Sequence, residues 1–413
     1  MKISSWCGLV GAMALAVGAA ENWPQFRGPE GQGHTDAAQL PLTWSKTQNV
    51  TWRTELPGKG FSSPVLWGDQ LWMTAALEEG LSFHALCVDK NSGKLLHDVE
   101  IFRREKALAI QTKNSHASPS PVIEAGRVWV NFGTTGTACL DTGTGQILWR
   151  SQELQLDHLV GPGSSPVLYQ NLLILTCDGA DVQYMAALDK LTGKLVWKTP
   201  RSGQLRANPD VKKSFCTPLV AAVAGRDQLI SPGADWVYGY EPLTGQEIWR
   251  VGYTGFSVVP RPVVGHGLAF ICTGFAKPEL LAIRLGAKGT ATATHIAWRD
   301  ARHIPLKPSL VLVHDELYAV GDTGFLTCFD ARTGQRRWEE KLAGNFSASP
   351  LAAPGRMYFF SEEGHVTVFA PGRECRKLGE CELGERVMAS GAVSGAALFL
   401  RTDKALYRLE ERR

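Results

Sequence analysis

The stretch Asp189-Lys-Leu-Thr-Gly193-Lys-Leu-Val-Trp197 decides the fold, because variants of it recur along the chain. The aspartate can cap a tight turn, and the glycine supplies the positive φ that such a turn needs. The tryptophan follows on a strand, where its large face can pack between neighbouring sheets. Six copies, the fifth of them degenerate, have turn glycines 52, 48, 52, 44 and 45 residues apart, at Gly93, Gly145, Gly193, Gly245, Gly289 and Gly334. This period indicates a repeat protein.

A second marker precedes each turn, namely a proline that opens a short apolar strand. Proline costs no ladder hydrogen bond at the first residue of a strand. An eighth unit without this proline opens near Val387. Between marker and tryptophan, each unit has room for four short antiparallel strands, which is one propeller blade. The seven prolines are Pro64, Pro121, Pro166, Pro218, Pro262, Pro308 and Pro350.

The two ends of the repeat array are incomplete in complementary ways. The last unit stops at Leu409 without a tryptophan strand, whereas residues 49–56 contain Trp52 but follow no other strands of a blade. We expect residues 49–56 to complete the last blade and to remove its exposed edge. The predicted fold is all-β: an eight-bladed β-propeller of four-stranded antiparallel blades, closed by an N-terminal strand. It forms a single domain over residues 21–413, with a lead-in at 21–48.

The first twenty residues follow a separate pattern. Lys2 precedes an apolar, small-residue stretch from Leu9 to Ala20, and Glu21 ends it abruptly. This pattern is typical of a cleavable signal peptide at residues 1–20. No later segment has the roughly eighteen consecutive apolar residues of a spanning helix. We therefore expect a periplasmic or secreted protein with no membrane span in the mature chain.

Composition narrows the class of partner. The chain carries 43 basic and 40 acidic residues, a net charge of +3, and shows no basic stripe. A nucleic-acid-binding protein usually shows such a stripe, so we expect no nucleic-acid partner. Cys87, Cys139 and Cys328 each stand two residues before a repeat aspartate and are predicted to be small buried residues. Cys375 and Cys381 form the one candidate disulfide, and the sequence leaves open whether it forms.

Two sets of polar residues are candidates for a site. Asp178 and Asp181 flank a glycine and offer carboxylate oxygens for a hard cation, although an aspartate-stabilised turn explains them equally well. Four basic residues fall near the starts of inner strands, where they would make the central channel or its mouth positive and attract an anionic ligand. The alternative for these is structural ion pairing. They are Arg206, Arg261, Arg302 and Lys307.

The repeat resembles a known family. Its Thr-Gly-x-x-x-Trp unit is similar to that of PQQ-dependent dehydrogenases and of BamB-type outer-membrane assembly proteins, which are eight-bladed propellers. Exported PQQ-like repeat proteins are more similar still, because they share openings such as Asn22–Pro29 and Trp52–Pro64. In quinoprotein alcohol dehydrogenases, two adjacent cysteines and a set of cation-binding acids accompany the cofactor. No two cysteines are adjacent in this chain, and it is shorter than those enzymes.

Taken with the lack of a Gly-x-Ser-x-Gly elbow or a phosphate loop, these features favour a binding module over an enzyme. We expect a monomeric, non-catalytic scaffold, with no cofactor, for an envelope protein, a peptide or a polysaccharide. The alternative is a quinoprotein oxidoreductase that binds PQQ and a divalent cation such as calcium in the central channel. A polysaccharide-active enzyme has only scattered aspartates to support it.

Overall fold

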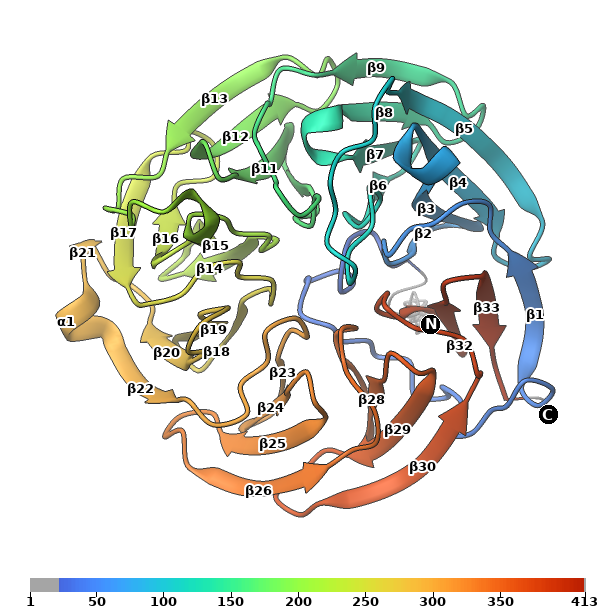
Figure 1. Cartoon of the computed structure of the whole chain (residues 1–413). Coiled ribbons are helices and arrows are strands. Elements are labelled where there is room, and N and C mark those ends of the chain that lie inside the picture. The colour runs from blue at the N-terminus through green and yellow to red at the C-terminus, as the bar shows by residue number, and fades with distance from the viewer. Residues whose placement is uncertain (1–21, 412–413) are drawn as a thin grey trace, which may run out of the picture.

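A computed structural model describes residues 22–411, so the predicted signal peptide lies outside the described residues. Within this range, eight antiparallel sheets stand around a central axis as the blades of a propeller (Figure 1). Each sheet has four strands, except one with five. The predicted fold class is therefore confirmed.

Blades are numbered here by their place along the chain, and the first strand of each lies nearest the axis. Blade 1 holds β2 (Val65–Trp67), β3 (Gln70–Leu77), β4 (Ser82–Asp89) and β5 (Leu95–Arg103). Blade 2 holds β6 (Val122–Glu124), β7 (Arg127–Asn131), β8 (Thr137–Asp141) and β9 (Ile147–Ser151). Blade 3 holds β10 (Val167–Tyr169), β11 (Leu172–Asp178), β12 (Gln183–Asp189) and β13 (Leu195–Pro200). Blade 4 holds β14 (Leu219–Val223), β15 (Arg226–Pro232), β16 (Trp236–Tyr240) and β17 (Glu247–Gly252).

The second half of the ring repeats this order. Blade 5 holds β18 (Val263–Gly265), β19 (Leu268–Cys272), β20 (Leu280–Arg284) and β22 (Ile296–Asp300). Blade 6 holds β23 (Val311–Val313), β24 (Glu316–Val320), β25 (Phe325–Asp330) and β26 (Arg336–Lys341). Blade 7 holds β27 (Leu351–Ala353), β28 (Arg356–Phe360), β29 (His365–Ala370) and β30 (Arg376–Glu382). Blade 8 holds β31 (Ala392–Ser394), β32 (Ala397–Arg401), β33 (Ala405–Leu409) and, as its outermost strand, β1 (Val50–Glu55).

The N-terminal strand closes the ring as predicted. β1 pairs antiparallel with β33, from Val50 opposite Leu409 to Glu55 opposite Ala405. Trp52 on β1 takes the place of the missing repeat tryptophan, and its Nε1 donates to the Lys90 carbonyl of blade 1 at 3.1 Å. The first and last parts of the described chain are thereby joined in one sheet.

The repeated turn has the structure that its residues predict. In blade 3, Asp189 Oδ1 accepts hydrogen bonds from the amide of Leu191 at 3.1 Å and from the amide and hydroxyl of Thr192, both at 2.8 Å. Gly193 follows with a φ of 72°. Asp141 and Asp330 make the same contacts. The motif therefore caps the hairpin between the third and fourth strands.

Two positions of the repeat were predicted wrongly. Gly289 is not in a tight turn but in β21 (Gly289–Thr290), which pairs in parallel with β17 as the fifth strand of blade 4. The connection that carries β21 also contains the one-turn helix α1 (Thr292–His295). Pro308 does not open its strand directly, because β23 begins at Val311. Ser309-Leu310 occupy the places that Ser-Pro holds in other blades.

Cys87, Cys139 and Cys328 are buried between blades, as expected for small core residues. The candidate disulfide is not formed: Cys375 and Cys381 are both free thiols, and Cys381 Sγ donates instead to the Leu42 carbonyl at 3.3 Å. No helix within residues 22–411 is long and apolar enough to cross a membrane.

The lead-in does more than precede β1. Residues 22–36 cross the centre of the ring in Figure 1, where they appear as the blue segment inside the blades. Trp23 bridges to Leu66 of blade 1, and the Pro24 carbonyl accepts from the amide of Ile123 in blade 2. His34 bridges to Ala352 of blade 7. Opposite blade 1, the amide of Val264 in blade 5 donates to Gln32 Oε1 at 2.7 Å. The lead-in thus contacts inner strands on opposite sides of the ring and lies across the channel.

Candidate functional site

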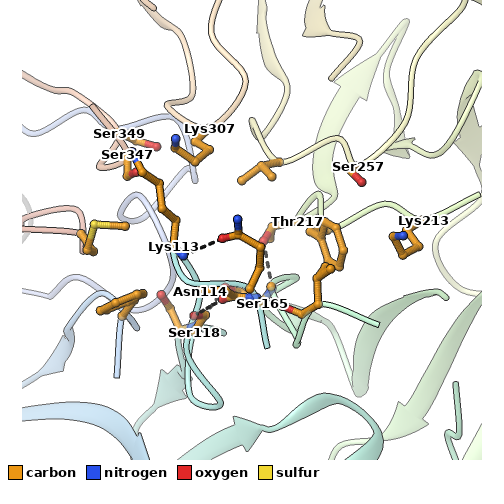
Figure 2. Close-up of a pocket in the computed structure, with 18 of the residues that line it drawn as sticks. Lys113, Asn114, Ser118, Ser165, Lys213, Thr217, Ser257, Lys307, Ser347 and Ser349 are labelled. Atoms are coloured by element: carbon orange, nitrogen blue, oxygen red, sulfur yellow. Dashed lines mark hydrogen bonds between the residues drawn. The ribbon is translucent and has the colours of Figure 1, made fainter. Parts of the chain in front are cut away.

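A cavity of about 570 Å³ lies on the axis of the propeller, and we call it the cup (Figure 2). Its wall comes from the segments that lead into the innermost strand of every blade, so all eight blades contribute. Phe26 of the lead-in also lines it. Because the lead-in crosses the ring there, the cup is the open end of a channel that the chain itself blocks.

A belt of hydroxyl groups surrounds the cup. The second residue before each innermost strand has a buried amide that lies outside the strand ladder, and such a group needs a partner. In seven of the eight positions the residue is Ser or Thr, and its hydroxyl accepts the amide of the preceding blade's residue. In each bond the amide of the first residue donates to the hydroxyl of the second: Ser63 to Ser120 (2.8 Å), Ser120 to Ser165 (2.9 Å), Ser165 to Thr217 (2.9 Å), Arg261 to Ser309 (3.0 Å), Ser309 to Ser349 (3.0 Å), Ser349 to Ser390 (2.9 Å) and Ser390 to Ser63 (3.0 Å).

Arg261 is the one residue of the belt that is not a hydroxyl amino acid. Its side chain is 2% exposed and turns toward the lead-in. The guanidinium donates to the Pro218 carbonyl at 3.1 Å, the Phe26 carbonyl at 2.6 Å and Gln25 Oε1 at 3.0 Å. Arg261 therefore fastens the lead-in, including the cup residue Phe26, to blades 4 and 5.

Three buried arginines surround the cup without acidic partners. Burial lowers the pKa of Arg27 to about 9, that of Arg261 to about 10 and that of Arg401 to about 9, so each remains charged at neutral pH. Arg27 donates to the Leu310 carbonyl at 2.5 Å, and Arg401 donates to Ser62 Oγ at 2.6 Å. Neutral oxygens accept hydrogen bonds from all three guanidinium groups, while Nε and Nη1 of Arg27 and Nε of Arg401 are buried without a hydrogen-bond partner. No carboxylate in the described chain forms an ion pair with them.

Three lysines also line the cup, and each has an acidic neighbour. Lys113 Nζ lies 3.1 Å from Glu362, and Lys307 Nζ lies 2.6 Å from Asp322. Lys213 is buried, with Asp210 as its partner at 3.9 Å, and burial lowers its pKa. The mouth of the cup is consequently close to neutral, whereas the buried arginines add positive charge behind the wall.

Apolar side chains form the rest of the wall, among them Phe61, Phe215 and Phe256. At the mouth, Leu159 and Phe275 are 37% and 44% exposed. The backbone of Leu159 has a φ of 57°, and that of Ser257, another cup residue, has a φ of 49°. Non-glycine residues in this left-handed region cost energy and tend to cluster at functional sites. The cup thus combines hydroxyl donors, an apolar wall and a strained mouth.

The predicted basic residues go to different places. Lys307 lines the cup, and Arg261 belongs to its belt. Arg206 lies outside the lining and forms a two-pronged pair with Asp235 at 2.8 and 2.7 Å. Arg302 has a side chain that is 61% exposed and lies 3.4 Å from Glu339. The structure therefore brings two of the four to the cup and places the other two in ion pairs elsewhere.

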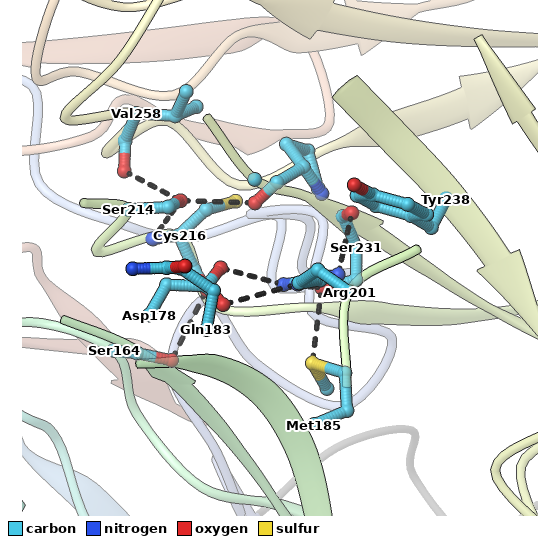
Figure 3. A network of polar contacts seen from close by, with 12 residues as sticks. Ser164, Asp178, Gln183, Met185, Arg201, Ser214, Cys216, Ser231, Tyr238 and Val258 are labelled. Carbon is cyan, nitrogen blue, oxygen red and sulfur yellow. Dashed lines mark hydrogen bonds and ion pairs between the residues drawn. The ribbon is translucent and has the colours of Figure 1, made fainter. Parts of the chain in front are cut away.

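The two predicted carboxylates are engaged separately. Asp178 is buried and accepts two hydrogen bonds from Arg201, at 3.0 and 2.7 Å (Figure 3). Asp181 Oδ1 accepts from the amide of Asp157 at 2.7 Å. Within residues 22–411, no group of three or more His, Cys, Asp or Glu side chains is arranged to hold a metal ion.

Comparison with known proteins places this geometry in a family. The sequence model of the family described as outer membrane protein assembly factor BamB matches residues 35–231 and 233–374. The chain belongs to the BamB family. No curated protein sequence matches the chain.

Two solved structures show how far the BamB-family fold extends. BamB from Moraxella catarrhalis superimposes with a TM-score of 0.62 at 14% identity, over 87% of this chain and 99% of that one. A europium-containing methanol dehydrogenase superimposes with a TM-score of 0.59 at 11% identity, over 93% of this chain and 90% of that one. At these identities the likeness concerns the fold alone.

The dehydrogenase neighbour raises the question of whether the cup could hold a quinone with a metal ion. A hard cation needs several oxygen ligands, usually with carboxylates among them. Among residues 22–411, Asp210 is the single carboxylate residue that lines the cup, and it lies beside Lys213. None of the cysteines that the structure describes lines the cup either. The donor set of this BamB-family chain therefore does not fit a quinone–cation centre.

Sequence reasoning missed the main features of the cup. Ser63, Ser120 and Ser165 stand directly before the marker prolines, so the belt was visible as a repeated Ser-Pro. The role of the hydroxyls was not visible in the sequence, because each hydroxyl accepts an amide proton from a residue of a neighbouring blade. The repeat pattern also could not predict that the lead-in blocks the channel, because the lead-in is not part of a repeat.

Proposed function

We propose that this BamB-family chain is an exported, non-catalytic binding module whose cup receives a segment of an envelope protein, a peptide or a polysaccharide. The observation that carries the proposal is the cup itself: about 570 Å³, walled by all eight blades and blocked by the lead-in. A cavity of this size and mixed lining is typical of ligand sites.

The lining residues support binding without catalysis. General acid–base chemistry on a glycosidic bond needs two carboxyl groups across the substrate, and Asp210 has no second carboxylate facing it in the lining. The belt hydroxyls accept amide protons, and no histidine in the described part of the chain lines the cup to activate them. We also propose that the protein works without a quinone cofactor, because the cup offers one carboxylate where a cation needs several ligands.

The family supports an envelope role. Its description refers to outer-membrane protein assembly, and residues 1–20 have the pattern of a signal peptide. We propose that the mature chain acts outside the cytoplasm, in the periplasm or as a secreted protein, as a monomeric scaffold. The rigid ring would present the cup and its surrounding loops to the partner.

The test compares the capture of envelope components by the immobilised full chain and two surface variants. Phe275→Asp places a charge at the mouth of the cup, where Phe275 is 44% exposed. Leu191→Asp is the matched control, because Leu191 is 50% exposed and lies in the outer turn of blade 3. We expect a saturable partner to bind the wild type and Leu191→Asp but not Phe275→Asp. Capture that is equal for all three proteins, or absent from the wild type, would refute the proposal.

A further inference from the structure

We propose that the cup binds its ligand through an oxyanion, a phosphate, sulfate or carboxylate group held against the hydroxyl belt. This inference rests on the proposed function, since it names the chemistry of a ligand in the same cup. Two observations that the binding role does not require support it. In the described chain, hydroxyl protons of the belt have no acceptor on the wall of the cup, and the buried arginines behind that wall have no carboxylate partner.

The first observation concerns the protons of the belt. Five belt hydroxyls line the cup and accept an amide proton, and none has an acceptor for its own proton in the described chain: Ser63, Ser120, Ser165, Thr217 and Ser390. A sixth, Ser349, uses its proton on Ser309 Oγ at 3.0 Å. An oxygen that accepts a hydrogen bond becomes a stronger donor. The belt therefore offers donors that call for an acceptor-rich ligand.

The second observation decides between an anion and a neutral polyol. Each buried arginine bonds a residue of the lining or the neighbour of a belt residue. Arg261 donates to the carbonyl of Phe26, which lines the cup. Arg401 donates to Ser62, next to Ser63. Arg27 donates to the carbonyl of Leu310, next to Ser309. Buried charges are normally paired, and these three have no carboxylate. An anion in the cup would supply the missing countercharge.

The remaining lining describes the rest of the ligand. Lys113 and Lys307 are neutralised by Glu362 and Asp322, so they add little net charge at the mouth. Phe61, Phe215 and Phe256 offer apolar and aromatic surface. The geometry fits a ligand with an oxyanion at one end and an apolar or aromatic body. The oxyanion would contact one part of the belt, directly or through ordered water.

The experiment is calorimetry of the full chain with inorganic phosphate, sulfate, acetate, glucose and phenyl phosphate. We expect saturable binding of at least one of the three simple oxyanions, tighter binding of phenyl phosphate than of phosphate, and no binding of neutral glucose. Phosphate or sulfate binding without acetate binding would identify a tetrahedral ester group, and the reverse would identify a carboxylate. Failure of every oxyanion at millimolar concentration, or glucose binding as tight as theirs, overturns the inference.

Variants of the belt locate the site. Thr217→Val removes a free hydroxyl proton and should weaken oxyanion binding by about tenfold or more, because hydrogen bonds to charged groups are the strong ones. Thr192→Val is the matched control, because its hydroxyl donates to Asp189 in the outer turn of blade 3 and does not line the cup, so binding should change little. Thr217→Ser keeps the hydroxyl and should bind the oxyanion as the wild type does, which keeps the test usable if Thr217→Val impairs folding. Equal weakening by Thr217→Val and Thr192→Val overturns the inference. Partner capture that survives such a failure would leave the binding role standing.

Discussion

The indole of Trp149 in blade 2 lies against Gly193 in the turn of blade 3, so close that a β-carbon on Gly193 would come within 2.5 Å of Trp149 Cε3. Trp149 Nε1 also donates to the Lys190 carbonyl of the same turn at 3.0 Å. The same relationship joins Trp52 to Gly93 and Trp298 to Gly334. In these pairs the two fixed residues of the motif meet between blades, whereas Trp249 lies against Gly239 of its own blade.

This contact predicts a large effect of Gly193→Ala on stability. The variant would place a methyl group on the indole and force alanine into a φ of 72°. Left-handed backbone costs about 1–2 kcal/mol and overpacking about 1–3 kcal/mol more. Gly126→Ala is the control, because Gly126 has a φ of 80° but no atom within 4 Å of the added carbon. Urea unfolding should show a clearly larger loss of unfolding free energy for Gly193→Ala, and equal losses would contradict the packing role.

The same contact shows why the ring could be predicted from the sequence. The Asp189–Trp197 motif contains its own turn chemistry, and the strand-opening prolines together with the unit near Val387 give the number of blades. The errors fall where a local pattern was matched without its neighbours. Gly289 has the spacing of a turn glycine but joins a different blade, and Pro308 precedes its strand by an extra two residues.

The cup was less predictable because its parts meet across the whole chain. The belt bond between Ser390 and Ser63 joins residues 327 positions apart and exists only once the ring is closed. Arg27 lies in a segment with no repeat signal, yet it reaches Leu310 in blade 6. The predicted positive channel depended on which basic residues face inward. The repeat register placed Arg261 and Lys307 at the cup but gave no reason to separate them from Arg206 and Arg302.

Acid should destabilise the protein in part through His158. Its Nε2 accepts the amide of Thr134 at 3.2 Å, and burial lowers its pKa to about 4. Because the folded pKa lies below the ordinary value of 6.5, the unfolded chain binds the proton more readily. The stabilisation by neutral His158 is thus complete above pH about 6.5 and declines as pH falls toward 4.

The measurement is the unfolding free energy at pH 7 and pH 4.5 for the wild type and His158→Gln, which keeps an acceptor near Thr134. The wild type should lose about 2 kcal/mol more than the variant over this range. Carboxylates titrate in both proteins, so the difference between them isolates the histidine. Identical pH profiles would show that His158 is protonated as easily in the folded chain as in the unfolded one.

The buried pair of Asp178 and Arg201 should behave as a unit (Figure 3). Burial alone would lower the pKa of Arg201, but Asp178 and two nearby tyrosines raise it well above its ordinary value. The guanidinium also donates to Ser231 Oγ at 2.9 Å and lies 4.8 Å from the ring centre of Tyr238. Asp178→Asn leaves a buried cation without its countercharge and should cost about 4 kcal/mol of unfolding free energy.

The double variant Asp178→Leu with Arg201→Met replaces the pair with apolar side chains. It should recover most of the stability that Asp178→Asn loses, because no buried charge remains unpaired. Chemical denaturation of the wild type, the single variant and the double variant measures this. A double variant less stable than Asp178→Asn would show that the pair contributes net stability through its hydrogen bonds to blade 4.

The last prediction separates the binding module from a quinoprotein. Titration of the full chain with PQQ and calcium should show no dependence of PQQ binding on calcium, because Asp210 is the single carboxylate that the described residues bring to the cup and has Lys213 beside it. PQQ carries carboxylates, so the proposed oxyanion site could bind it weakly without any metal. Chelation of calcium should then leave that binding unchanged, whereas Thr217→Val should weaken it. Binding near one equivalent that is lost on chelation would instead support the oxidoreductase, and alcohols and sugars would then be the substrates to test.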